Sequence, residues 1–118
     1  MSNNQIEFYK MILNNHNTVN ERKNCKLVYS EELEKLAKKH IDELIAKKQI
    51  YHGNLPNNGL QNIASGKKNL LKDNVCVNLW MGDSGHRNPI VNSQFKKFGV
   101  AMTINSNNDV IIVANYSK

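Results

Sequence analysis

The sequence predicts an α+β fold, a three-layer α-β-α sandwich in which helices cover both faces of a small antiparallel sheet. Apolar residues recur at helical spacing in the N-terminal half of the chain, over about residues 4–16 and again over 31–48. The C-terminal part alternates as a β-hairpin does, over 98–104 and 110–116. Because both faces of this hairpin carry apolar residues, we expect helices on both sides of it.

The second helix is the clearest of the predicted elements. Ser30 is a good N-cap, and Lys47 and Lys48 complement the negative end of the helix dipole. The apolar residues between them follow the i, i+3, i+4, i+7 spacing of one buried face: Leu33, Leu36, Ala37, Ile41, Leu44 and Ile45. His40 lies on this face, and a core or border histidine explains it more readily than a ligand does.

A loop and a third helix are expected in the middle of the chain. Residues 53–59, with the sequence GNLPNNG, are dense in turn formers. The segment from Leu70 to Met81 is apolar on more than one side, which predicts a deeply buried helix that ends at Gly82. His52 and His86 both fall on predicted loops, which suggests that they share one cleft.

Length and composition limit the classes of protein to consider. The 118 residues are enough for one domain, over 1–118. No apolar run approaches the ~20 residues of a membrane span. The N-terminus lacks the apolar stretch of a signal peptide, so either the protein stays inside the cell or an export segment lies outside this chain. Two cysteines, Cys25 and Cys76, could form one disulfide or remain two buried thiols.

The net charge of +6 comes mainly from lysines that occur in dispersed pairs. Nucleic-acid binding typically needs arginines and aromatic residues interleaved along one face, so this pattern favours a solvated surface instead. Weak contact with anionic surfaces is compatible with the charge.

Six phrases in order along the chain resemble the CAP superfamily, or SCP domain, which includes cysteine-rich secretory proteins, antigen 5 and plant pathogenesis-related proteins. The phrases are LNNHN at 13–17, LVYSEELEKLA at 27–37, YHG at 51–53, LQNIA at 60–64, WMGDSGHRNPI at 80–90, and FGVA with VANY at 98–101 and 113–116. The chain is most similar to the compact bacterial type of this superfamily.

The resemblance implies the α-β-α sandwich and a cleft that holds two histidines and two acidic residues. The histidines correspond to His52 and His86, and the second acidic residue corresponds to Asp83. The first acidic position holds Gln61, which can hydrogen-bond but cannot act as a general base. The resemblance also implies that the histidine pair could bind a divalent metal such as Zn²⁺, in an open and weak site.

Two functions therefore follow as expectations. The first is a non-catalytic binding module, secreted or on the cell surface, with a lipid, sterol or protein ligand. The second is a metal-assisted hydrolase or peptidase that uses the same cleft, although Gln61 removes its best candidate base. The substitution at this position favours the binding module. An intracellular interaction protein is a further alternative.

Overall fold

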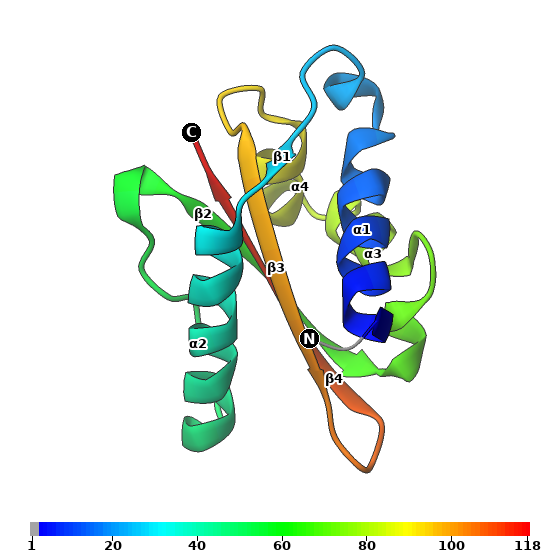
Figure 1. Ribbon diagram of the computed structural model, residues 1–118, viewed down its shortest axis with the longest axis vertical. Coiled ribbons are helices and arrows are strands. Elements are labelled where there is room, and N and C mark those ends of the chain that lie inside the picture. Colours follow the sequence, from blue (N-terminus) through cyan, green and yellow to red (C-terminus); the bar gives the residue numbers. More distant parts are fainter. Residues whose placement is uncertain (1–2) are drawn as a thin grey trace.

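The computed structural model describes residues 3–118, in which helices and strands are interspersed along the chain (Figure 1). In order, these are α1 (Asn3–Asn17), β1 (Val28–Tyr29), α2 (Glu31–Lys47), β2 (Leu60–Lys67), α3 (Val75–Met81), α4 (Ser84–Val91), β3 (Lys97–Ile104) and β4 (Asp109–Ser117). Three 3₁₀ turns, η1 (Asn20–Arg22), η2 (Pro56–Asn58) and η3 (Lys68–Leu71), lie between them.

The strands form one sheet in the order β1-β3-β4-β2. The predicted hairpin is β3 and β4, in which Val100 pairs with Ala114, and β2 adds antiparallel to the other side of β4. The sheet is mixed rather than wholly antiparallel, because the short β1 pairs parallel with β3. The periodicity did not indicate β1 or β2 as strands: β1 has two residues, and two amide side chains interrupt the apolar alternation of β2.

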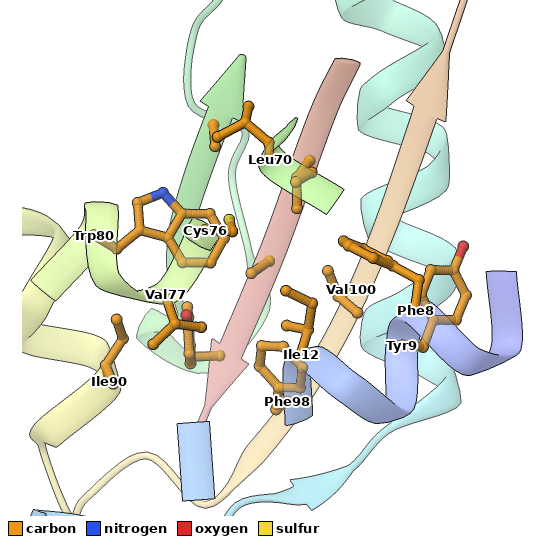
Figure 2. Close-up of a cluster of buried hydrophobic side chains, with 14 of the residues drawn as sticks. Phe8, Tyr9, Ile12, Leu70, Cys76, Val77, Trp80, Ile90, Phe98 and Val100 are labelled. Carbon is orange, nitrogen blue, oxygen red and sulfur yellow. The ribbon is translucent and has the colours of Figure 1, made fainter. Parts of the chain in front are cut away.

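Helices cover both faces of the sheet, as predicted. Helix α2 lies on one face, and α1, α3 and α4 lie on the other (Figure 1). The alternation of the hairpin divides its side chains between two cores. The larger core contains Phe98, Val100 and Trp80, and Figure 2 shows it between α1, α3 and the strands. The smaller core, beneath α2, contains Ala101 and Val113.

Helix α2 has the predicted caps and crosses the sheet unusually closely. The hydroxyl of Ser30 accepts a hydrogen bond from the Leu33 backbone amide at 3.2 Å. A Cβ atom added at Gly99 of β3 would lie 2.3 Å from the backbone nitrogen of Glu34. Glycine is therefore required at position 99 for the backbones of α2 and β3 to approach one another.

The single helix predicted over 70–81 is wrong, because the segment is broken into η3 and α3. Asn74 adopts the left-handed conformation with φ 67° and precedes the first residue of α3. The side chain of Asn15, in α1, holds the break: its Nδ2 donates to Asp73 Oδ1 at 2.8 Å, and its Oδ1 accepts from the Asn74 amide at 3.1 Å. Gly82 follows the end of α3 as predicted.

The paired lysines are all exposed, which agrees with their interpretation as a solvated surface. Both cysteines are free thiols, with Cys76 buried and Cys25 partly buried. Within residues 3–118, no helix combines the length and apolar character needed to cross a membrane.

Candidate functional site

His52 and Gln61 lie together where the segment after α2 meets the start of β2. The Oε1 atom of Gln61 accepts a hydrogen bond from the Gly53 backbone amide at 2.9 Å. The same oxygen lies 3.4 Å from His52 Nδ1. The Gln61 side chain therefore holds the turn that presents the exposed His52 ring.

The other end of the Gln61 amide is also occupied. Its Nε2 donates to Asn115 Oδ1 at 2.8 Å, and Asn115 Nδ2 donates in turn to the Leu33 carbonyl at 3.1 Å. Asn115 is fully buried. This chain of hydrogen bonds links β2, β4 and α2. At position 61, where the resemblance implies an acidic residue, the protein therefore has a neutral amide whose oxygen and nitrogen are both hydrogen-bonded.

His86 and Asp83 form the second pair, at the N-terminal end of α4. His86 lies in a helix rather than on the predicted loop, because Asp83 is an effective N-cap and starts α4 directly after Gly82. The Asp83 Oδ2 atom accepts from the His86 backbone amide at 3.4 Å and lies 2.8 Å from His86 Nδ1. Asp83 therefore both caps the helix and orients the ring.

A buried polar network supports His86 from below. Asn62 Nδ2 donates to the His86 carbonyl at 2.8 Å and lies 3.2 Å from the Tyr116 hydroxyl. The Tyr116 hydroxyl lies 2.6 Å from Nε2 of His16, whose Nδ1 lies 2.8 Å from the Ile12 carbonyl. Through these contacts, α1 is connected to the first turns of α4.

Arg22 holds the opposite end of α4. Its side chain is fully buried and donates to five backbone carbonyls, those of Cys25, Pro89, Ile90, Asn92 and Phe95. Its Nη1 also donates to the Cys25 Sγ atom at 4.0 Å. Three of these acceptors lie at or just beyond the C-terminal end of α4, where the helix dipole favours a positive charge. No sequence pattern indicated a role for Arg22, Asn62 or Asn115, since most of the groups that they bind are distant in the chain.

The pair His52–Gln61 and the pair His86–Asp83 are held by side chains on opposite faces of β2. Gln61 and Asn62 are consecutive residues of this edge strand, so their side chains point to opposite faces of the sheet. Gln61 binds the turn of His52 on the α2 face, while Asn62 binds the backbone of His86 on the other face. Whether the two rings close on one cleft is untested and stays a prediction.

The donor atoms fit a metal only partly. Each histidine has its Nδ1 near an oxygen atom, of Gln61 or Asp83, which leaves Nε2 as the nitrogen for a ligand. Metal-binding histidines commonly have such partners. Across the described part of the chain, however, no group of three or more His, Cys, Asp or Glu side chains is placed to hold a metal ion. A metal on the two histidines would need water or another molecule as its remaining ligands.

The layers, the edge strand and the order of these polar side chains define an α-β-α sandwich of the cysteine-rich secretory type. The family model described as CAP, the cysteine-rich secretory protein family, matches residues 13–116. The chain therefore belongs to the CAP family, and the resemblance of its six phrases is confirmed.

Solved structures share the fold. An outer surface protein from Borrelia burgdorferi superimposes with a TM-score of 0.81 at 24% identity, over 95% of this chain and 92% of that chain. A structure of NaASP2 with Zn²⁺ gives 0.68 at 17% identity, over 98% and 82% of the two chains. The venom allergen-like protein 4 of Schistosoma mansoni gives 0.64 at 18%, over 99% and 89%. No match was found among curated protein sequences.

Proposed function

We propose that this chain is a non-catalytic binding module of the CAP family, secreted or displayed at the cell surface. The observation that carries the proposal is the state of Gln61. Its amide is neutral, and both of its ends are engaged, with Gly53 and with Asn115. A side chain in this state cannot take a proton from a water molecule, which a hydrolase of this kind requires.

Asp83 is the one carboxylate among the four cleft positions, and it already makes structural contacts. Its Oδ2 atom serves the His86 ring and the His86 backbone amide together. Removing a proton from a substrate would compete with the cap of α4. These contacts support a structural role for Asp83 rather than catalysis.

The proposal includes a weak divalent metal site on His52 and His86. Both rings would bind the ion through Nε2, because Nδ1 of each faces an oxygen atom. Zn²⁺ suits neutral imidazole ligands. The crystal structure of NaASP2 with Zn²⁺ is indirect support from a protein of the same fold. A bound ion would supply a positive centre for an anionic or carbonyl group of a ligand.

A lipid or sterol is one proposed ligand, and a protein is the other. An apolar groove of about 710 Å³ runs beside α1 and is lined by Phe8, Met11, Leu71, Met102 and Ile104 among others. This volume falls within the range of small-molecule sites. The groove supports a ligand with an apolar part. The name of the Borrelia burgdorferi outer surface protein supports a location outside the cell.

Calorimetric titration with Zn²⁺ tests the cleft, with the native chain compared with the His52→Ala/His86→Ala variant. We expect the variant to lose one binding event that the native chain shows. If both proteins bind the same number of ions with the same affinity, the two histidines are not metal ligands.

A peptidase assay tests the absence of catalysis. With Zn²⁺ present, the native chain and the Gln61→Glu variant are incubated with a mixture of fluorogenic peptides, and cleavage is followed. We expect no turnover by the native chain. Turnover that is lost in the His52→Ala/His86→Ala variant would refute the non-catalytic proposal in favour of the hydrolase. Activity gained only by Gln61→Glu would show that position 61 is what separates the two functions.

A further inference from the structure

His40, in the middle of α2, is a buried histidine that lines a small cavity. Only 5% of the residue is exposed. Its Nε2 lies 2.6 Å from the Tyr51 carbonyl, and the Tyr51 ring packs edge-on at 5.2 Å between centroids. Because a carbonyl oxygen only accepts hydrogen bonds, Nε2 carries the hydrogen. In the neutral ring, the lone pair is therefore on Nδ1.

Gly53 covers the face of this ring and leaves its edge open. A Cβ atom added to Gly53 would lie 2.9, 3.0 and 3.3 Å from Nδ1, Cε1 and Cγ of His40. Nearly equal distances to three adjacent ring atoms place that position above the ring face rather than in its plane. The in-plane direction from Nδ1, along which an imidazole binds a ligand, is not blocked by Gly53.

Glu43, on the next turn of α2, faces this nitrogen. Its Oε2 lies 3.6 Å from His40 Nδ1, and about half of the carboxylate side chain (46%) is exposed. With the neutral ring, a lone pair and a carboxylate oppose one another, so the arrangement favours a cation between them. Either a proton on Nδ1 or a metal ion bound by both atoms would remove the repulsion between the lone pair and the carboxylate.

The separation of these two atoms suits a metal. Two ligands with bonds of ~2.0–2.1 Å at the tetrahedral angle lie about 3.4 Å apart. The two side chains come from one helix at positions i and i+3, a spacing that places them on the same face of the helix. The contact between His40 Nε2 and the Tyr51 carbonyl is the second hydrogen bond that fixes the ring of a metal-binding histidine.

The neighbouring cavity has room for the remaining ligands. It has a volume of about 180 Å³, and its lining includes His40, Glu43, Gly53 and Gln61. A water molecule takes ~30 Å³ in the liquid, so several waters fit. Lys39 also lines this cavity, and its positive charge opposes the binding of a cation there.

From this geometry we propose a second metal site, separate from the cleft histidines, in which His40 Nδ1 and the Glu43 carboxylate bind a divalent transition metal such as Zn²⁺ and water completes the coordination. One nitrogen and one oxygen ligand favour Zn²⁺ over Mg²⁺ or Ca²⁺, which prefer oxygen. With two protein ligands the site is weaker than one with three. The cavity shares Gln61 with the cleft as a lining residue, but the metal ligands proposed here are neither His52 nor His86.

The test uses the His52→Ala/His86→Ala variant as the parent, so that the cleft histidines contribute nothing. The ring nitrogens of its remaining histidines are followed by long-range ¹H–¹⁵N NMR during titration with Zn²⁺. We expect the Nδ1 resonance of His40 to shift saturably while Nε2 stays protonated. This readout needs no substitution of the buried His40 itself.

Three substitutions in this parent separate a metal site from general electrostatics. Glu43→Gln should weaken Zn²⁺ binding by at least about tenfold. Glu32→Gln, which removes the same charge from another exposed position of α2, should leave the affinity unchanged. Lys39→Gln should strengthen binding, because it removes the opposing charge. If Zn²⁺ leaves His40 Nδ1 unperturbed, or if Glu43→Gln binds as tightly as its parent, His40 and Glu43 are only an ion pair and the proposal is overturned.

Discussion

The imidazole of His16 and the hydroxyl of Tyr116 are joined by a contact of 2.6 Å, although 100 positions separate them in the chain. The donors in this contact follow from its neighbours. His16 Nδ1 faces the Ile12 carbonyl and must carry the hydrogen, so Nε2 accepts from Tyr116. Tyr116 in turn accepts from Asn62. The hydrogen bonds of His16, Tyr116 and Asn62 can all form together only while His16 is neutral.

Stability should therefore fall in mild acid. Burial is the main cause that lowers the pKa of His16 from 6.5 to about 4. Between these two values the unfolded chain binds a proton that the folded chain does not, so stability is lost as the pH falls from 6.5 toward 4. The full shift corresponds to about 3 kcal/mol. Urea unfolding at several pH values between 7.5 and 4 would measure the loss.

A variant that cannot titrate at position 16 is the control. His16→Gln is expected to be less stable at neutral pH, because it disturbs the network, but its stability should depend less on pH over the same interval. Since the carboxylates titrate in both proteins, the difference between the two curves isolates His16. Parallel curves would contradict the assignment.

Gln61→Glu should destabilise the fold at neutral pH. The substitution places a carboxylate oxygen against Asn115 Oδ1, and rotation of the Asn115 amide would instead turn Oδ1 toward the Leu33 carbonyl. An unpaired acceptor of this kind costs about 1–3 kcal/mol. Chemical denaturation would show the loss, and protonation of the introduced carboxyl at low pH should reduce it.

The exposed Gln49 provides the matched control for that experiment. Gln49→Glu makes the same chemical change without a buried partner and should alter stability by less than ~0.5 kcal/mol. If Gln61→Glu were equally harmless, the chain of hydrogen bonds through Asn115 would not be what holds Gln61.

Gly99→Ala should be strongly destabilising, by about 3 kcal/mol. Its methyl group would lie 2.3 Å from the Glu34 backbone nitrogen, so α2 would have to move away from the sheet. Gly82→Ala is the comparison, because the nearest atom to an added Cβ there is 3.5 Å away and its φ of −78° suits any residue. Thermal unfolding of the two variants should differ markedly; similar midpoints would argue against the close packing of α2.

The two cysteines should differ in reactivity. Cys76 is fully buried, and desolvation raises the pKa of its thiol to about 12, so very little thiolate forms at neutral pH. Cys25 is partly exposed. Iodoacetamide should modify Cys25 in the folded protein and Cys76 only after unfolding, as mass spectrometry of the peptides would show. Modification of Cys76 in the native protein would mean that α3 opens readily.

Much of the candidate site could be located from the chain alone, whereas its contacts could not. The family phrases marked His52, Gln61, Asp83 and His86. Only the folded structure shows that Asn115 engages Gln61 and that Asn62 supports the backbone of His86. Nothing in the spacing of two asparagines identifies such partners, because each lies 24 or more positions from the group it binds.

By itself, the sequence determined the family, the helix α2 with its Ser30 cap, and the two-sided β3–β4 hairpin, because these depend on local propensity and on periodicity. The tertiary structure decided the pairing of β2, the break before α3 and the interaction of Arg22 with five backbone carbonyls. Each of these is set by contacts between segments far apart in the chain. The free energy of such contacts outweighs local preference only once the layers have packed together.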